Sequence, residues 1–576
     1  MNDAAVPARL PLGQWLESRG LISADQLRIA LREQTRHARP MGRVLIDLGF
    51  ISEGILRDAL GQSLGHASID LDQVLPDPAA LARLPERVAR QHRVLPVSCS
   101  EDGRQMTVAM ADIHDIVALD VMRDMLPHDA TLTTLLAGEG ELAQAIDRSY
   151  GHALSIEHIL AELENHGPEQ ANRVAQDGSP PVVRLVDALL IDAVKREASD
   201  IHFEPEAGFL RIRYRIDGLL RQIRALHASC WPAMAVRIKV MAGMNIAEHR
   251  APQDGRLSLH VSGRAIDLRV SSQPTLHGEN IVLRILDRAR GIVPLDSLGL
   301  SEPTRQALTL LMARPEGLIL ATGPTGSGKT TTLYSLLNHL NHEGVNIMAL
   351  EDPVEYPMPL MRQTSVVEAA RLDFANGIRS MMRQDPDIIL VGEIRDADTA
   401  GMAFRAAMTG HQVYSTLHSN SALGALPRLL DLGVRQDVLA GNLIGVIAQR
   451  LLRRLCPECS QPRIAGAADM RLLGMAADTA PVVLRDAGGC PACDFTGYRG
   501  RFAVMEILRI DAGLEGLIGT GASAAELRRA AGTGLRSLAD EGADAVLAGR
   551  TSLAELCRVI DMSSRLAGLH AERGAS

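Results

Sequence analysis

The chain has 576 residues, of which 46% are hydrophobic, and its formal net charge is −9. This length is enough for roughly three or four domains with cores of their own. The acidic balance and an aromatic content of only 3% disfavour a basic or base-stacking surface, so the sequence predicts no nucleic-acid partner.

The cellular compartment is indicated by the lack of a signal peptide or membrane-spanning segment, and the role of the cysteines by their spacing. The first residues have no apolar core of signal-peptide type, and no run of about 18 uncharged apolar residues occurs. We therefore expect a cytoplasmic protein that associates with a membrane peripherally, through partners. Four of the seven cysteines form two close pairs, which in a reducing compartment favours metal binding over disulfides.

Residues 1–65 contain an internal repeat. Gly13 and Gly20 recur 29 residues later as Gly42 and Gly49, and the apolar residues between them have mostly helical spacing. The repeat predicts a helical module of two packed hairpins, in which Gly20 and Gly49 end helices.

The next segments have different patterns. Residues 66–152 mix helix and strand patterns and predict an α+β domain. The polar stretch 153–178, with Gly, Pro, Asn and Gln, is typical of a linker. In 179–292, a helix pattern from Pro181 to Arg196 precedes several segments of strand-like alternation, which predicts a second, smaller α+β domain.

The remainder, 293–576, has the pattern of an α/β domain. Buried-type strands at 318–322, 346–350 and 388–392 alternate with helix patterns, and such runs suit a parallel sheet covered on both faces. About 65 residues at the end have helical patterns. An insertion at about 453–503 carries the paired cysteines.

The strongest motif is G-x-x-x-x-G-K-T, which follows the strand 318–322 and leads into a helix pattern. Its glycines allow backbone N–H groups to close on phosphate oxygens, and the helix start adds a positive dipole. Lys329 is expected to reach the β- and γ-phosphates of ATP, and the Thr330 hydroxyl to bind Mg²⁺. The alternative is a glycine-rich turn that binds nothing. The residues expected to bind nucleotide are Gly323, Pro324, Thr325, Gly326, Ser327, Gly328, Lys329, Thr330 and Thr331.

Carboxylates follow two of the predicted strands. Glu393 comes after the strand 388–392, at the sheet edge that carries the phosphate loop, and we expect it to hold the Mg²⁺ shell. Glu351, Asp352 and Glu355 reach the same edge after the strand 346–350. We expect Glu351 to orient the attacking water. A surface turn around the proline at 353 is the alternative.

Two histidines flank a further strand pattern. His418 follows this strand, and we expect it to sense the γ-phosphate at the strand end. His411 precedes the strand. The alternative for each is a structural histidine whose hydrogen bonds are satisfied within the fold.

The paired cysteines have the spacing of zinc knuckles, and four thiolates suit a closed, structural Zn²⁺ site. The long gap between the pairs must fold as a hairpin-like insertion; free thiols are the alternative. The expected ligands are Cys456, Cys459, Cys490 and Cys493. The isolated cysteines, which we expect to be buried core thiols, are Cys99, Cys230 and Cys557.

Together these motifs resemble the secretion ATPase superfamily, which includes type II secretion motors and type IV pilus extension motors. The resemblance covers nearly the whole chain. It is carried by the phosphate loop, the acidic segment 351–355, the segment 392–396, the histidine segment 409–418, and segments of the preceding domain at 199–205, 213–218, 252–256, 267–271 and 278–284.

This resemblance implies a RecA-like ATPase domain with a zinc-binding insertion, preceded by a small PAS-like α+β domain and helical N-terminal domains. It further implies a homo-hexamer that holds ATP between domains and subunits. Arg269 and Arg284 would act as arginine fingers, for which the planar guanidinium is suited. Alternatively they satisfy strand edges or bind subunits. Arg379, Arg383 and Arg395 are expected to link subunits or support the site.

The resemblance also implies partners at a bacterial inner membrane. In type II secretion motors the region equivalent to 66–150 docks on the cytoplasmic domain of an inner-membrane protein, and the ring engages a platform protein to assemble a pseudopilus. We therefore expect an ATP-driven secretion motor. The alternatives are a type IV pilus extension motor and a nucleotide-binding regulatory scaffold that does not hydrolyse ATP.

The opening repeat resembles a cyclic di-GMP-binding module of two tandem motifs that each begin Arg-Leu-Gly. Here Pro11 and Pro40 stand in place of both arginines. A plain docking or packing role is the alternative.

Overall fold

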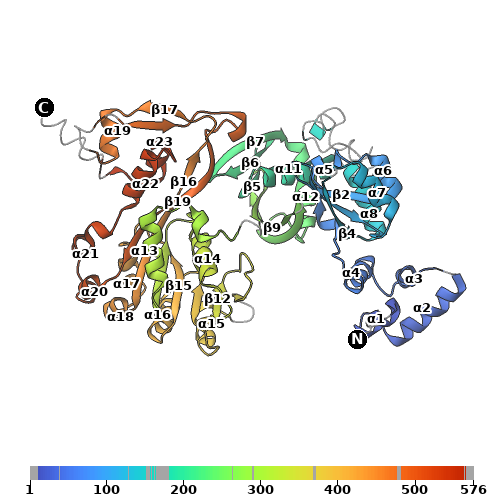
Figure 1. The fold of residues 1–576 in the computed structure, drawn as a ribbon, viewed down its shortest axis with the longest axis horizontal. Coiled ribbons are helices and arrows are strands. Elements are labelled where there is room, and N and C mark those ends of the chain that lie inside the picture. The colour runs from blue at the N-terminus through green and yellow to red at the C-terminus, as the bar shows by residue number, and fades with distance from the viewer. Residues whose placement is uncertain are drawn as a thin grey trace, which may run out of the picture. The chain divides into compact units, whose positions relative to one another are not determined.

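A computed structural model describes residues 11–150, 181–475 and 480–565, apart from positions 38, 101, 128, 262–263, 288–290, 367–371, 481 and 564; it also describes 156, 159–160 and 163. The predicted linker 153–178 therefore falls largely outside the described residues. The chain divides into two compact units, Met1–Ala289 and Arg290–Ser576, which are described one at a time below (Figure 1).

The first unit begins with the repeat, and the predicted helical hairpins are confirmed. Gly20 and Gly49 have φ values of +70° and +69° directly after the first helix of each hairpin, a conformation that favours glycine. The buried core repeats with the same period: Leu16 and Leu45, Ile22 and Ile51, and Ala30 and Ala59. The helices are α1 (Leu12–Ser18), α2 (Ala24–His37), α3 (Met41–Asp47) and α4 (Glu53–Leu64).

A small α+β region follows. Strands β2 and β3 are antiparallel, β3 and β4 are parallel, and the three form one sheet. Arg57 of α4, 8% exposed, donates to both carboxylate oxygens of Glu141 at 3.0 and 2.9 Å and so ties the helical repeat to α8. The elements are η1 (Leu71–Gln73), β1 (Val74–Leu75), α5 (Pro78–Leu81), α6 (Glu86–His92), β2 (Val94–Cys99), β3 (Gln105–Met110), α7 (Ile116–Asp124), β4 (Thr131–Leu136) and α8 (Glu139–Tyr150).

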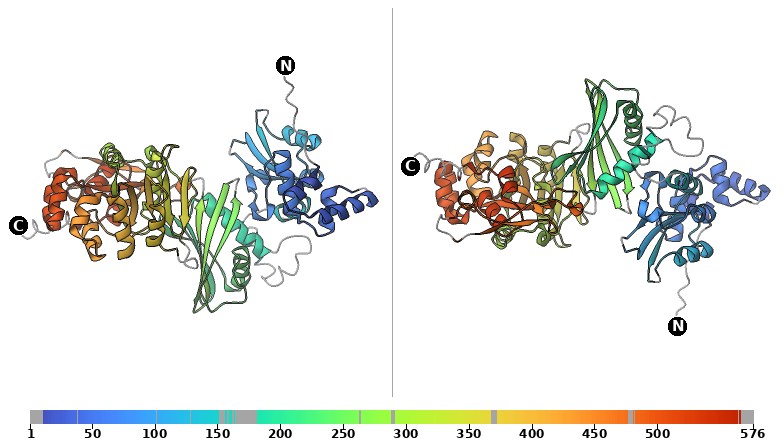
Figure 2. Two further views of the ribbon diagram at one scale, coloured as in Figure 1. Left: turned by 90° about the horizontal axis from the view of Figure 1, so that it is seen from below. Right: turned by 90° about the horizontal axis from the view of Figure 1, so that it is seen from above.

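The rest of the first unit is a seven-stranded sheet in the order β1-β8-β9-β10-β5-β6-β7. Alternate residues such as Ile201, Tyr214 and Leu268 lie in a core shared with α11 and α12, which Figure 2 shows beside the sheet. The elements are α11 (Pro181–Lys195), β5 (Asp200–Pro205), β6 (Phe209–Ile216), β7 (Leu219–His227), η2 (Ala228–Cys230), α12 (Trp231–Met241), β8 (Gln253–Val261), β9 (Arg264–Thr275) and β10 (Gly278–Asp287). The helix predicted from Pro181 is thus confirmed.

The second unit is built on a seven-stranded sheet in the order β13-β12-β14-β15-β11-β16-β19. All neighbouring pairs are parallel except β16 with β19. The strands are β11 (Gly317–Thr322), β12 (Ile347–Glu351), β13 (Met361–Ser365), β14 (Ile388–Val391), β15 (Gln412–Leu417), β16 (Leu443–Leu455) and β19 (Tyr498–Arg509). The predicted parallel sheet is confirmed. The antiparallel edge strand β19 was not predicted from the sequence.

Helices cover both faces of this sheet, as predicted. Leu318 and Leu320 of β11 pack in one core with α15–α18, whereas Ile319 and Ala321 pack in another with α13 and α14. The remaining elements are η3 (Leu295–Leu298), α13 (Glu302–Met312), α14 (Lys329–Leu340), α15 (Phe374–Met381), α16 (Ala397–Met408), α17 (Ala425–Asp431), α18 (Gln436–Asn442), α20 (Ala512–Gly519), α21 (Ala524–Ala531), η6 (Gly532–Gly534), α22 (Leu538–Leu547) and α23 (Leu553–Val559).

The cysteine insertion continues directly from β16. After Cys456, β17 (Gln461–Ile464) pairs antiparallel with β18 (Val483–Asp486), and α19 (Ala467–Leu472) lies between them in sequence. In the second cysteine pair, Cys490 is the N-cap of η5 (Pro491–Cys493) and Cys493 is its last residue. The predicted hairpin-like insertion is confirmed.

The isolated cysteines differ from one another. Cys230 is buried as predicted, Cys99 is half-buried, and Cys557 is exposed, so the prediction of a buried thiol was wrong at Cys557. The reason is helical geometry. Leu556 of α23 packs in the buried core, and the next residue along the helix, Cys557, is turned about 100° away from that buried face.

Candidate functional site

The predicted phosphate loop forms a tight turn between β11 and α14. Gly323, Gly326 and Gly328 have φ values of +148°, +78° and +88°, a region that side chains disfavour. Gly328 is the N-cap of α14 and no side chain caps the helix. The first N–H groups of α14 are therefore not used by a capping side chain, which is the arrangement that binds anions at helix starts.

Lys329 lies folded over this loop. Its Nζ donates to the carbonyl oxygens of Gly323 at 2.8 Å and Pro324 at 3.1 Å. Burial lowers the pKa of Lys329; Glu393 opposes this effect and the nearby Arg450 adds to it. Thr330 is exposed at the start of α14. The loop thus presents a cation, a hydroxyl and backbone donors on a short stretch of chain.

Glu393 follows β14 at the same sheet edge and is the carboxylate whose charge acts on Lys329. It forms an ion pair with Arg395, and this contact raises the pKa of Arg395. The Nε2 atom of His418, which follows β15, lies 3.8 Å from the second carboxylate oxygen. Glu393 therefore lies among three basic side chains, Lys329, Arg395 and His418, and all three come from segments that the sequence analysis singled out.

Glu351 occupies a different environment. It is 4% exposed, accepts a 2.5 Å hydrogen bond from the Tyr334 hydroxyl of α14, and accepts another from Gln363 at 3.2 Å. Burial raises the pKa of Glu351 against the lowering effect of these hydrogen bonds. Both oxygens of this carboxylate thus have partners inside the fold.

His411 lies at the opposite end of β15 from His418. Its Nδ1 is 2.9 Å from the carbonyl oxygen of Ala406 and 3.1 Å from the hydroxyl of Thr409. These contacts link the end of α16 to β15. The two histidines of the motif therefore lie at different edges of the sheet.

Arg269 and Arg284 belong to the first unit. The strand register places Arg256, Arg269 and Arg284 side by side across β8, β9 and β10, with Asp200 of β5 next in the row. Directly opposite residues of antiparallel strands share one face, so three arginines line one face of the sheet. The Nε of Arg284 donates to Asp200 at 3.3 Å, and 56% of the Arg284 side chain is exposed.

Several neighbours of the phosphate loop escape sequence analysis. Arg450 of β16 donates to the carbonyl oxygens of Gln449 at 2.9 Å and Asn420 at 3.2 Å, and burial lowers its pKa. The hydroxyls of Thr322 and Ser419 are 2.8 Å apart. These residues lie outside the motif and contact it only because β15 and β16 flank β11, so no local pattern could have identified them.

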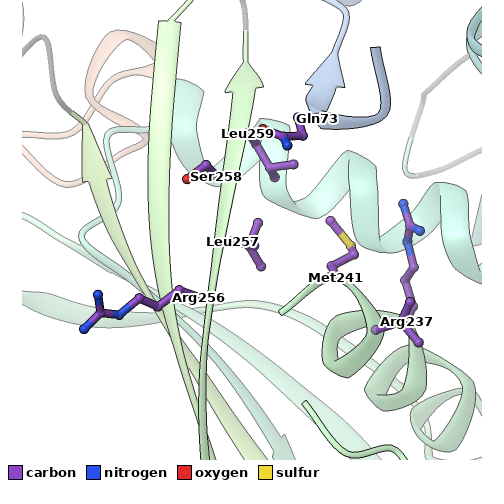
Figure 3. Close-up of a pocket in the computed structure, with 8 residues that line it drawn as sticks. Gln73, Arg237, Met241, Arg256, Leu257, Ser258 and Leu259 are labelled. Carbon is purple, nitrogen blue, oxygen red and sulfur yellow. The ribbon is translucent and has the colours of Figure 1, made fainter. Parts of the chain in front are cut away.

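A cavity of about 500 Å³ lies in the first unit, between β8 and α12. Leu257 and Met241 contribute apolar surface, and Figure 3 shows Arg256 and Arg237 on opposite sides of it. Arg237 also pairs with Asp187 at 3.2 Å. None of the residues that the sequence analysis expected at a nucleotide or metal site lines this cavity.

The four predicted metal ligands are brought together. Their sulfur atoms all lie within 4.8 Å of one another, with Sγ–Sγ distances of 3.8 Å for Cys456–Cys490, 3.7 Å for Cys459–Cys493 and 3.7 Å for Cys490–Cys493. A tetrahedral Zn²⁺ with Zn–S bonds of about 2.3 Å places its sulfurs about 3.8 Å apart. The cluster therefore fits zinc.

Backbone groups support the cluster. The N–H groups of Gly497 and Cys490 point at the Cys493 sulfur, at 3.2 and 3.4 Å. Although burial raises the pKa of Cys493, these donors and the neighbouring thiols lower it to about 6. Donors of this kind stabilise the thiolate form that metal binding requires.

The fold and the loop define a P-loop ATPase: a parallel sheet with helices on both faces, and a glycine-rich turn from strand to helix that carries the motif lysine. The chain belongs to the family described as type II/IV secretion system protein, whose model matches residues 175–558, and it hydrolyses ATP. An MshEN domain matches residues 61–156. Among the described residues, none of the helices is both long and apolar enough to span a membrane.

Relatives resemble the chain over most of its length. The "Type II secretion system protein E" of Pectobacterium carotovorum subsp. carotovorum is 40% identical over 83% of this chain and 96% of its own. The "Type IV pilus assembly ATPase PilB" of Myxococcus xanthus is 38% identical over 95% of this chain and 98% of its own. A solved "Structure of MshE with cdg" matches 24% of this chain and 98% of its own at 36% identity, with a TM-score of 0.21.

The geometry of the cysteine cluster predicts the effect of Gly488→Ala. A Cβ at position 488 would collide with the carbonyl oxygen of Cys459, a backbone atom that cannot move without displacing the ligand. We expect the purified full-length variant to retain less than about half of the zinc of the native protein, measured by elemental analysis, because the four ligands no longer meet.

Gly516→Ala is the matched control, since nothing lies within 4 Å of a Cβ there. A native zinc content in Gly488→Ala, or a native protein without zinc, would contradict the assignment.

Proposed function

We propose that this chain is the cytoplasmic, hexameric ATPase that powers type II protein secretion by driving pseudopilus assembly. The observation that carries the proposal is the grouping of Lys329, Glu393 and His418 around one phosphate loop, in a chain about 40% identical to type II secretion E proteins. In this proposal the ring acts through an inner-membrane platform protein, and the N-terminal region docks on the cytoplasmic domain of an inner-membrane protein.

The proposed domains follow the sequence boundaries. Residues 1–65 form the repeat module, 66–152 the docking domain, 179–292 a small PAS-like domain, and 293–576 a RecA-like ATPase domain with a structural Zn²⁺ at 453–503. The separate sheets of the two units and the four clustered thiols support the boundary near 292 and the insertion. Strand β1 (Val74–Leu75) of the docking domain pairs with β8 of the small domain, so these two domains share a sheet.

At the ATPase site, the loop residues 323–331 would hold the phosphates and Mg²⁺ would neutralise their charge. Glu393 is the acid that faces this loop, so among the acids we assign it to the Mg²⁺ shell and to the attacking water. Glu351, expected from sequence to orient that water, has both oxygens engaged by Tyr334 and Gln363. We infer that it acts through Tyr334, by holding α14. His418 would respond to the γ-phosphate through Glu393.

Arg269 and Arg284 would supply positive charge to the γ-phosphate within the hexamer. The Arg284 side chain supports this role, because Asp200 accepts from its Nε while 56% of the side chain is exposed. A guanidinium held at Nε presents a pre-oriented fork to phosphate.

A type IV pilus extension motor is the second candidate. The pilus assembly relative covers 95% of this chain, against 83% for the type II relative, so its similarity extends further along the chain. Capture of membrane partners with the full-length chain separates the two: we expect recovery of a type II platform protein together with pseudopilins. Recovery of pilus platform and pilin components instead would establish the second candidate.

The N-terminal module carries a further proposal, cyclic di-GMP binding between its two hairpins. The exact period of its buried core supports it, and the MshEN match at 61–156 begins only in the last turn of the module, within α4. Pro11 and Pro40 depart from the expected motif. Calorimetric titration of cyclic di-GMP into the full-length chain should give saturable binding. No heat of binding, with ATP binding intact, would leave docking as the role of the module.

The roles of the two glutamates can be separated by substitution. We expect Glu393→Gln to lower kcat by a factor on the order of 10²–10³ while ATP still binds, because the acid facing the phosphates is lost. Glu351→Gln and Tyr334→Phe should lower kcat by similar factors, because both weaken the same hydrogen bond. Both decreases should be smaller than that of Glu393→Gln. Turnover and nucleotide affinity are measured on the full-length chain, with Lys329→Ala as the inactive reference.

If Glu351→Gln abolished turnover while Tyr334→Phe left it near native, Glu351 would itself orient the water and the assignment to Glu393 would fail.

A further inference from the structure

One buried amide joins the phosphate loop to the strand beside it. Gln449 of β16 is 1% exposed. Its Nε2 donates to the carbonyl oxygen of Ser327 at 2.9 Å, and its Oε1 accepts from the Thr332 hydroxyl at 2.7 Å. The side chain therefore contacts both the end of the loop and the first turn of α14, and its nitrogen and its oxygen each form a hydrogen bond.

The contact fixes the direction of a peptide group. In a trans peptide the C=O and the following N–H point in opposite directions. Since the Ser327 carbonyl is directed at Gln449, the Gly328 N–H points away from β16 and toward the side on which the loop closes on phosphate. Gly328 is also the N-cap of α14, and no side chain caps that helix.

Two glycines of the motif leave room for Gln449 and its strand, β16. A Cβ at position 328 would lie 2.8 Å from the side-chain nitrogen Nε2 of Gln449, and a Cβ at position 323 would lie 2.7 Å from the backbone carbonyl oxygen of Gln449. Close approach of β16 is therefore a second reason for glycine at both positions, beside their positive φ angles.

We propose that Gln449 is a positioning residue of the ATPase: its amide holds the Ser327–Gly328 peptide in the orientation that presents the Gly328 N–H to the nucleotide phosphates. The proposal rests on nucleotide binding at this loop. Preorganised donors bind a charged group without the cost of reorienting at the moment of binding. Without the Gln449 donor, the Ser327 carbonyl would be buried with no partner, and the peptide would turn to find one.

The chain offers a matched control in Gln412 of β15. It is 4% exposed and its Nε2 also donates to backbone carbonyls, those of Met312 at 3.1 Å and Arg314 at 2.6 Å. This contact lies at the amino end of β15, the end opposite the phosphate loop. Replacing either glutamine removes a buried amide of the same kind, and only one of the two touches the loop.

The test compares Gln449→Met with Gln412→Met in the full-length protein. We expect Gln449→Met to raise the Kd of ADP and the KM of ATP about tenfold, with kcat changed less than about threefold. A loop N–H binds substrate and transition state alike, so its loss weakens both equally. Gln412→Met should lower the melting temperature by a similar amount and leave the Kd of ADP within about twofold.

Equal changes of the ADP Kd in the two variants, or none in either, would overturn the proposal. Gln449→Glu provides a second measurement if the Met variant does not fold. It retains an acceptor for Thr332 and loses the donor to Ser327, so it should also weaken ADP binding about tenfold; native affinity in this variant would equally overturn the proposal. Absence of ADP binding in the native protein would instead refute nucleotide binding at the loop itself.

Discussion

The ATPase unit depends on the direction of a few peptide groups between β11 and α14. In the proposed function backbone N–H groups bind a triphosphate here, and these groups converge only if the chain turns through positive φ at three glycines. The surrounding residues hold that turn through its carbonyl oxygens. Lys329 folds back on two loop carbonyls, and Gln449 engages a third.

Strand β16 connects this loop with the four-cysteine cluster. Gln449 touches the loop, Arg453 forms a buried 2.7 Å ion pair with Glu555 of α23, and Cys456 follows the end of the strand. Arg453 also lies over the Tyr498 ring at 3.9 Å. The cysteine insertion is therefore anchored to an interior strand of the sheet, next to the edge strand β19, and not to a surface loop. A metal held by these four cysteines would stiffen the strand that supports the phosphate loop.

The first unit relies on a division between the faces of its sheet. One face packs on α11 and α12 through apolar residues, and the other carries the arginine row of β8, β9 and β10. Like charges on neighbouring strands repel each other, and here Asp200 at the end of the row offsets part of that repulsion. Such a surface favours an anionic ligand, which accords with the arginine-finger role proposed for Arg269 and Arg284.

The sequence by itself determined the features that are local in the chain. The phosphate loop, the buried strands, the hairpin repeat with its glycine ends and the paired cysteines are all encoded by residue type and spacing over short distances. Only the tertiary structure decided which residues meet across strands and helices. Glu351 and Glu393 both follow strands of one sheet, yet one is held by Tyr334 and the other faces Lys329. Gln449 reaches the loop from 122 residues away in sequence. Strand order and side-chain packing set these contacts, and neither leaves a periodic signal in the chain.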